Sequence, residues 1–401
     1  MPISIFVDLN AALGRAVELG ASDIHLKVGQ PPVLRRDGEL GLLPDHAPLY
    51  ESDLQVVLAA VADLAPAKLS HFHETGELDI AYTTHGLPRF RVNGFRQRGS
   101  ISFAFRVIPD EVPSFGQLRL PNGVRRVADE HRGLVLVTGA TGSGKTTTLA
   151  AVIDHINRTR RQHIVTIEDP IEILHSDHGC IVNQREVGLD TESFLAAIRR
   201  VLRQDPDVIL IGELRDAETA ETALKAAESG HLVFSTMHTI DAAETIGRMI
   251  EFFPAEKQDQ IRSILAGVLR GVVSQRLLPR LNGGRVAAVE VMINNSRIAE
   301  LIRESRAEEI SDAIAEGQFF EMQTFAQALI ELVVAGEVDR EVAANASTNR
   351  HDFLVELDQA LKRKAAGVET DRPVSAMAEP EPANPAQQPM PNLRIAASPE
   401  G

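Results

Sequence analysis

Residues 139–146 have the types and spacing of a phosphate-binding loop, G-x-x-x-x-G-K-[ST]. Small residues let backbone amides approach a polyanion, a lysine adds positive charge, and a hydroxyl reaches a bound Mg²⁺. An apolar strand pattern precedes the loop and a helical pattern follows it, so a helix N-terminus adds free N–H groups. A Gly- and Ser-rich turn that binds nothing is the alternative. We expect nucleotide contacts from Gly139, Ala140, Thr141, Gly142, Ser143, Gly144, Lys145, Thr146 and Thr147, with Thr146 also a metal ligand.

A second candidate group brackets the apolar strand expected at 207–211. In a doubly wound sheet the ligand lies beyond the carboxyl ends of the strands. A strand of six residues spans about 20 Å, so Asp207 at the amino end is too far from the phosphates, whereas Glu213 can reach them. We predict that Glu213 orients or deprotonates the attacking water, directly or beside Mg²⁺. A helix-capping or salt-bridged glutamate is the alternative.

The strand expected at 163–167 also ends in acids, at the same edge of the sheet. Glu168, Asp169 and Glu172 follow it, and their carboxylates are suited to hold waters bound to Mg²⁺. We treat Glu168 as a candidate metal ligand and catalytic residue and Glu172 as a candidate catalytic residue. A solvated acidic loop would have the same composition.

Two histidines flank the strand expected at 231–236. By the same geometry His238 faces the γ-phosphate, and His231 lies at the far end. The imidazole of His238 can respond to the presence of the γ-phosphate. A structural histidine is the alternative.

Arginines cluster between residues 89 and 106, outside the phosphate-binding domain. They form either a solvated β-face or a source of positive charge that reaches the nucleotide across a domain or subunit boundary. Arg91 and Arg106 are the first candidates for the second role.

The elements that must position these residues follow an alternating order. Strands are expected at 133–138, 163–167, 207–211, 231–236 and 286–293, with helices at 145–157, 192–204, 215–229, 241–251 and 255–272 between them. This alternation predicts an α/β domain with a largely parallel sheet.

Shorter patterns surround this domain. Residues 1–108 alternate as a small α+β domain, and 109–121 carry three prolines and a glycine, typical of a linker. The nucleotide-binding core is expected at 122–295, and 296–365 has the pattern of a helical bundle. Residues 366–401 contain seven prolines and few apolar residues, which predicts a disordered tail.

Composition restricts the partners. The 401-residue chain has a net charge of −15, which argues against a nucleic-acid-binding surface as its main feature. A single cysteine, Cys180, excludes a disulfide framework and a cysteine-rich zinc site. The first residues show no signal peptide, and no apolar run approaches the roughly 18 residues needed to span a bilayer. We expect a cytoplasmic protein.

Several stretches together resemble the secretion ATPase superfamily and, within it, the type IV pilus retraction ATPases that drive twitching motility. They are ASDIHL at 21–26, RFRVNGFRQRG at 89–99, GATGSGKTTT at 139–148, TIEDPIE at 166–172, LRQDPDVILIGELRD at 202–216, GHLVFSTMHT at 230–239 and RIAELIRE at 297–304. The middle stretches are similar to the Asp box, Walker B and His box of that superfamily. The lone cysteine also separates the chain from assembly and type II secretion ATPases, which carry a four-cysteine insertion.

The resemblance implies a PAS-like N-terminal domain, a RecA-like P-loop ATPase core, ATP and Mg²⁺ as ligands, and a homohexameric ring. It also implies an inner-membrane pilus platform protein and other pilus ATPases as partners, at the inner face of the cytoplasmic membrane. A pilus-assembly or type II/IV secretion ATPase is one alternative. A nucleotide-gated scaffold, or a nucleic-acid binder without motor turnover, is another.

Overall fold

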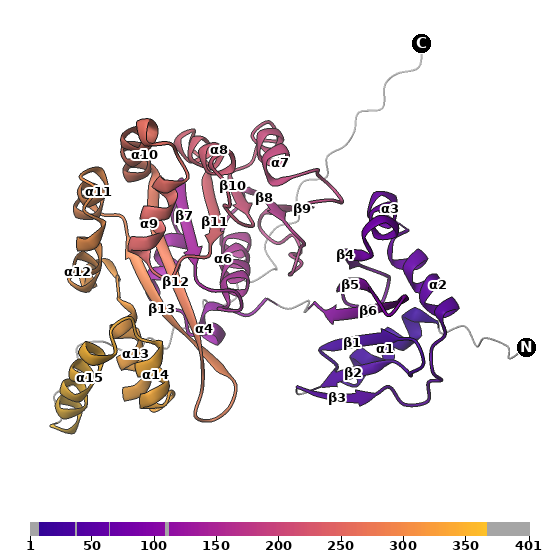
Figure 1. Cartoon of the computed structure of the whole chain (residues 1–401). Coiled ribbons are helices and arrows are strands. Elements are labelled where there is room, and N and C mark those ends of the chain that lie inside the picture. Colours follow the sequence, from indigo (N-terminus) through magenta and orange to yellow (C-terminus); the bar gives the residue numbers. More distant parts are fainter. Residues whose placement is uncertain (1–7, 37, 64, 109–111, 367–401) are drawn as a thin grey trace, which may run out of the picture.

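The computed structural model describes residues 8–36, 38–63, 65–108 and 112–366. Figure 1 shows two sheets, each with its own helices. Strand β6 (Ser100–Val107) belongs to the first sheet, and helix α4 (Phe115–Leu118) leads into the second. Within the described part of the chain, no helix is long and apolar enough to cross a bilayer. The predicted tail at 366–401 lies almost wholly outside the described residues.

The N-terminal domain is a six-stranded antiparallel sheet in the order β3-β2-β1-β6-β5-β4. Its strands alternate because one face packs on the core, so Phe90 and Val92 are buried and Arg91 between them is not. The other elements are α1 (Leu9–Glu18), β1 (Asp23–Lys27), β2 (Val33–Arg36), β3 (Glu39–Leu42), α2 (Glu51–Val61), α3 (Pro66–Thr75), β4 (Glu77–Tyr82) and β5 (Phe90–Gln97).

The second sheet has seven strands in the order β13-β12-β7-β11-β10-β8-β9. Neighbouring strands are parallel except β13, which is antiparallel to β12. The central strands are buried along their whole length, as expected when helices cover both faces. The strands are β7 (Gly133–Thr138), β8 (His163–Glu168), β9 (Ile181–Glu186), β10 (Val208–Ile211), β11 (Leu232–Met237), β12 (Leu269–Pro279) and β13 (Arg285–Ile293).

Helices with polar caps connect these strands. Asp216 and Asp241 accept hydrogen bonds from the first-turn N–H groups of α8 and α9, which fixes where each helix begins. The helices are α5 (Asn122–Ala128), α6 (Lys145–Thr159), α7 (Phe194–Val201), α8 (Ala217–Glu228), α9 (Ala242–Glu251), α10 (Ala255–Val268), α11 (Ser296–Arg303), α12 (Ile310–Ala315), α13 (Phe325–Val334), α14 (Arg340–Ala346) and α15 (Arg350–Ala365). Together the two sheets and their helices confirm the predicted α/β class.

Two strands were not predicted. The helix expected at 255–272 ends at Val268, and β12 begins at Leu269, where the chain pairs with β7. Strand β9 lies at the edge of the sheet and pairs with β8. Strand β12 is paired with a strand far earlier in the sequence and β9 with the strand before it, and local periodicity carries no signal of either pairing.

The hydrophobic cores do not follow the segment bounds that the sequence predicts. Phe115 and Leu120, within the predicted linker, are buried in the core of the second sheet. The helices from residue 296 onward do not form one bundle. Helices α11 and α12 pack into that same core, whereas α13, α14 and α15 form a smaller core with the distal part of β12 and β13.

Candidate functional site

The phosphate-binding loop joins β7 to α6, and its glycines have positive φ angles. They are 140° at Gly139, 79° at Gly142 and 93° at Gly144. A Cβ on Gly139 would lie 2.4 Å from the carbonyl oxygen of Gln275, so a side chain is excluded there. The buried Nζ of Lys145 donates to the carbonyl oxygens of Gly139 at 2.6 Å and Ala140 at 3.0 Å. The loop therefore has the cradle shape that a polyphosphate requires.

Glu213 and His238 meet at the carboxyl edge of the sheet. Glu213 follows β10, and its Oε2 lies 3.4 Å from Nε2 of His238, which follows β11. The other carboxylate oxygen pairs with Arg215, an exposed residue. Burial lowers the pKa of Lys145, and the charges of Glu213 and Glu172 oppose this shift. The structure thus brings the lysine, the acid and the imidazole to one edge, as strand direction predicts.

The residues expected at the opposite edge lie there. Asp207 precedes β10 and accepts a hydrogen bond from the backbone N–H of His163, the first residue of β8. The imidazole of His231 contacts the carbonyl oxygen of Ala226, at the end of α8. Neither side chain is directed at the phosphate-binding loop.

Glu168 differs from the other predicted site residues because neighbours within the sheet hold its carboxylate. Its Oε1 accepts from Thr166 at 2.6 Å and from Gln184 at 3.1 Å. Burial raises the pKa of Glu168, although these hydrogen bonds act in the opposite direction. Glu168 does not line the cavity described next, whereas Glu172, four residues further on, does.

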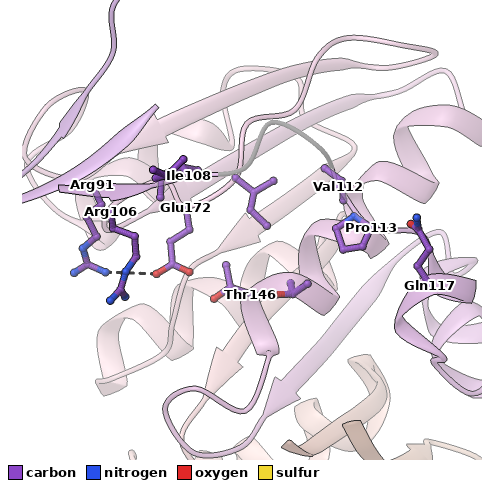
Figure 2. Close-up of a pocket in the computed structure, with 11 residues that line it drawn as sticks. Arg91, Arg106, Ile108, Val112, Pro113, Gln117, Thr146 and Glu172 are labelled. Atoms are coloured by element: carbon purple, nitrogen blue, oxygen red, sulfur yellow. Dashed lines mark hydrogen bonds and ion pairs between the residues drawn. The ribbon is translucent and has the colours of Figure 1, made fainter. Parts of the chain in front are cut away.

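A cavity of about 510 Å³ lies between the two domains (Figure 2). One part of its wall is polar, with hydroxyls of the helix that follows the phosphate-binding loop and two arginines of the N-terminal domain. The rest is mainly apolar and comes from the end of β6, the segment before α4 and the loop after β8. The lining residues are Arg91, Arg106, Val107, Ile108, Val112, Pro113, Gln117, Thr146, Thr147, Glu172 and Ile173.

Both predicted arginines reach this cavity, and both already contact carboxylates. Arg91 pairs with Asp79 at 2.9 Å and with Glu172 at 3.5 Å, and the proximity of Asp79 raises the pKa of Arg91. Arg106 pairs with Asp23 at 2.9 Å, and its side chain is 69% exposed. Exposed pairs of this kind contribute little to stability, so their guanidinium groups can exchange partners at small cost.

Sequence reasoning missed some residues at the site. Val112, Pro113 and Gln117 line the cavity, although the sequence pattern of their segment indicates only a linker. Arg215 was not singled out, and only its position two residues after Glu213 could have indicated it. Glu186, at the end of the unpredicted strand β9, contacts Arg89 of the N-terminal domain.

Comparisons with known proteins agree with this geometry. The model of the family "Type II/IV secretion system protein" matches residues 119–369. The "Type IV pilus retractation ATPase PilT" of Pseudomonas aeruginosa is 45% identical over 337 residues, which cover 84% of this chain and 97% of that protein. The "Twitching motility protein" of Neisseria gonorrhoeae is 45% identical over 279 residues, 69% of this chain and 75% of that protein.

Solved structures show the same relationship. A crystal structure of the pilus retraction motor PilT with bound ADP matches with a TM-score of 0.79 at 45% identity, covering 84% of this chain and 96% of that one. The ATPase DotB of Legionella pneumophila matches with a TM-score of 0.75 at 26% identity, covering 88% and 95%. The predicted resemblance is confirmed, and this chain belongs to the Type II/IV secretion system protein family.

Proposed function

We propose that this chain is a Mg²⁺-dependent ATPase that works as a homohexamer and powers the retraction of type IV pili. The observation that carries the proposal is the meeting of Lys145, Glu213 and His238 at one sheet edge. The chain is 45% identical to PilT over nearly all of that protein, and the PilT structure contains ADP. These relatives support an ATPase motor of pilus retraction over an assembly or secretion ATPase.

The interdomain cavity suits the two halves of a nucleotide. Val112, Pro113 and Ile173 offer an apolar surface to a base, while Thr146 and Thr147 lie at the start of α6, where helix N–H groups face a phosphate. The lining of the cavity therefore offers apolar contacts to the base and N–H and hydroxyl groups to the phosphates of ATP.

Mg²⁺ enters as part of the substrate. Thr146, at the cavity, and Glu213, near Lys145, are placed to hold the ion or its waters. Glu168 is the third proposed ligand; a divalent cation beside this buried carboxylate would favour its charged form and draw it from Thr166. Bound magnesium would neutralise charge that develops on the phosphates.

In the reaction, Glu213 is the base that orients or deprotonates water, and Arg215 and His238 fix its carboxylate. Lys145 would exchange its two loop carbonyls for phosphate oxygens. Arg91 and Arg106 would move from their carboxylate partners toward the phosphates, since both side chains line the same cavity. Glu172 would then be released from Arg91.

The partners follow from the family. We propose a ring of six copies at the inner face of the cytoplasmic membrane, acting on an inner-membrane platform protein together with other pilus ATPases. The net charge of −15 argues against nucleic acid as a partner.

Deleting the gene and purifying the protein test this function in two ways. We expect Mg²⁺-dependent ATP hydrolysis in vitro and an excess of immobile pili in the deletion strain. Loss of pili would instead indicate an assembly ATPase. A protein without turnover, in which Glu213→Gln changes nothing, would indicate a nucleotide-binding scaffold.

A further inference from the structure

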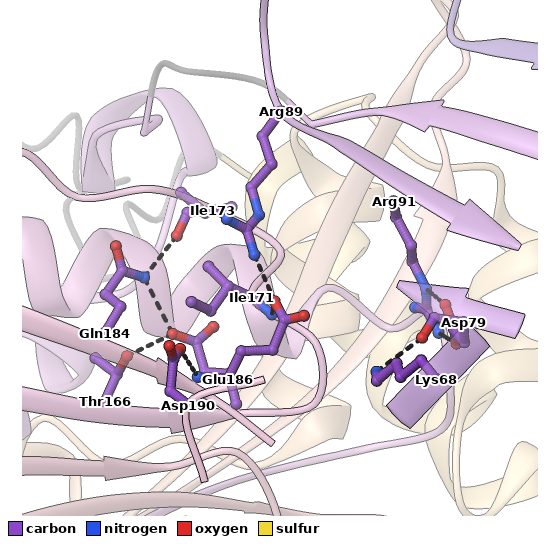
Figure 3. A network of polar contacts seen from close by, with 11 residues as sticks. Lys68, Asp79, Arg89, Arg91, Thr166, Ile171, Ile173, Gln184, Glu186 and Asp190 are labelled. Atoms are coloured by element: carbon purple, nitrogen blue, oxygen red, sulfur yellow. Dashed lines mark hydrogen bonds and ion pairs between the residues drawn. The ribbon is translucent and has the colours of Figure 1, made fainter. Parts of the chain in front are cut away.

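A buried ion pair joins the two domains beside the interdomain cavity, whose lining includes neither of its residues (Figure 3). Glu186, the last residue of β9, contacts the guanidinium of Arg89, which directly precedes β5 of the N-terminal domain. The side chain of Glu186 is 0% exposed and that of Arg89 is 11% exposed. The same carboxylate oxygen accepts a hydrogen bond from the backbone N–H of Ile171 at 3.2 Å. One carboxylate therefore holds both the other domain and the loop that follows β8.

The backbone around Glu186 is tied to that loop a second time. The N–H of Val187 donates to the carbonyl oxygen of Glu168 at 2.9 Å, and the N–H of Glu186 donates to Asp190 at 2.8 Å. Two hydrogen bonds therefore link Glu186 and its neighbour Val187 to the segment between Glu168 and Glu172, the proposed catalytic acids.

The N-terminal domain contacts the same region at further points. Arg91, two residues after Arg89, pairs with Glu172. A Cβ on Gly188 would lie 2.9 Å from Cε of Lys68, so the end of this α3 side chain lies against the turn that follows β9. These contacts place the loop beside two arginines of the opposite domain, Arg91 on β5 and Arg89 directly before it.

The burial of this ion pair makes its energy depend on contact between the two domains. A buried carboxylate is costly unless it is paired, and breaking a buried pair by removing one partner is strongly unfavourable. The ion-pair partner that the structure gives Glu186 belongs to the other domain. Yet Oε1 of Glu186 and Nε of Arg89 are buried without hydrogen-bond partners among the described residues, so the pair is incompletely satisfied. Separation of the domains lets water reach both groups.

We propose that Glu186 and Arg89 form a latch that positions the 168–172 loop only when the domains are closed. This inference rests on the proposed ATPase function and adds two positioning residues to it. In the closed state Arg89 fixes Glu186, Glu186 fixes the N–H of Ile171, and the loop presents Glu172 to the cavity. In the open state the loop loses this support, so turnover is coupled to domain closure.

The test combines Arg89→Gln, Glu186→Gln and the double variant in the full-length chain. Glu186→Gln keeps an oxygen for the N–H of Ile171 and therefore removes mainly the ion pair. Arg89→Gln also leaves the buried carboxylate of Glu186 without its partner. Fluorophores on Glu74→Cys and Arg203→Cys, exposed on α3 and beside α7, report interdomain distance with and without Mg²⁺ and ATP. Glu221→Gln, which removes a surface pair with Lys225, is the matched control.

We expect each single variant to bind ATP within about threefold of the native chain, to lose about 10- to 100-fold in kcat, and to populate the closed distance less. The double variant should be no worse than either single one, because both remove the same interaction. Additive losses, or unchanged closure with lower kcat, would overturn the latch.

Arg89→Lys, which keeps a cation, should recover part of the closure and secures the test if a glutamine variant unfolds. The interdomain distance can be measured whether or not ATP is hydrolysed. A native chain that closes with ATP but does not hydrolyse it would therefore contradict the proposed function and not the latch.

Discussion

At the scale of single residues, the ammonium of Lys145 is the most direct test of ATP binding. Lys145→Ala removes a charge-assisted contact to the phosphates, and contacts of this kind are worth about 1.5–3 kcal/mol, so affinity should fall roughly 10- to 100-fold. Calorimetric titration with ATP and Mg²⁺ measures the effect. Because Nζ also donates to Gly139 and Ala140, the melting temperature of the variant must be compared. Unchanged affinity in a folded variant would exclude the phosphate cradle.

The carboxylate of Glu213 should matter for turnover and little for binding. Glu213→Gln is expected to keep ATP affinity and to lose about 100- to 10,000-fold in kcat, the usual contribution of a positioned general base. Steady-state hydrolysis and nucleotide binding measured on one preparation separate the two effects.

Asp207→Asn is the matched control because it changes a carboxylate at the other end of the same strand. Its bond to the N–H of His163 is retained by the amide oxygen, so kcat should stay within about twofold. A folded Asp207→Asn variant that loses turnover would mean that the edge of the sheet has been assigned the wrong way round.

Not every residue of the site was predictable. Strand direction alone predicts that Glu213 and His238 lie at the same sheet edge as Lys145. It also predicts that Asp207 and His231 lie at the opposite edge. Glu186 had no such signal, because its partner Arg89 is 97 residues away in the sequence. A glutamate within an acidic chain gains its role only through a contact between domains.

At the scale of elements, Glu290 connects two helices to β13. Its Oε1 accepts from the N–H of Ala242 at the start of α9, and the backbone of Phe325 at the start of α13 also donates to this carboxylate. Burial nevertheless raises the pKa of Glu290 to about 7 and outweighs both helix N-termini. In the folded chain this group therefore keeps a proton that the unfolded chain has lost above its ordinary pKa of 4.5.

Stability should consequently fall as pH rises from about 4.5 to about 7, and this contribution is fully lost above the folded pKa. Glu290→Gln should remove this part of the slope and make the chain more stable than native at pH 8, by an amount on the order of 3 kcal/mol. Urea unfolding of both chains at pH 5 and pH 8 measures it. An equal difference between the two chains at both pH values would contradict the assigned protonation.

The sequence predicted elements that have a local pattern of their own and did not predict strands that are defined by pairing alone. The strands β7, β10 and β11 are short apolar runs, and α8 and α9 begin at capping aspartates, so each could be located from its own residues. Strand β12 follows α10 without a break, and only its pairing with β7 and β13 makes it a strand. The same absence of local signal concealed β9.

At the scale of the whole molecule, the three hydrophobic cores use residues from Leu9 to Leu357. We expect a chain that ends at Ala366 to keep its melting temperature within about 2 °C and to hydrolyse ATP at the native rate. Thermal unfolding and kcat of the truncated and full chains provide the comparison. A lower kcat would assign a role in turnover to the proline-rich segment.

The last question at this scale is whether a site is completed within one chain or by its neighbour in the proposed ring. In the structure Arg91 and Thr146 of one chain line one cavity, which favours arginines that act on the nucleotide of their own subunit.

Two inactive variants, Arg91→Ala and Glu213→Gln, can be unfolded together, refolded as mixed rings and assayed. If the arginine acts within its own chain, every site carries one defect and activity stays at the level of the separate variants. If a neighbour supplied it, about one quarter of the sites in randomly mixed rings would combine both native residues and recover turnover. Recovery near that fraction would contradict the arrangement seen here, and refolded native rings set the scale on which it is judged.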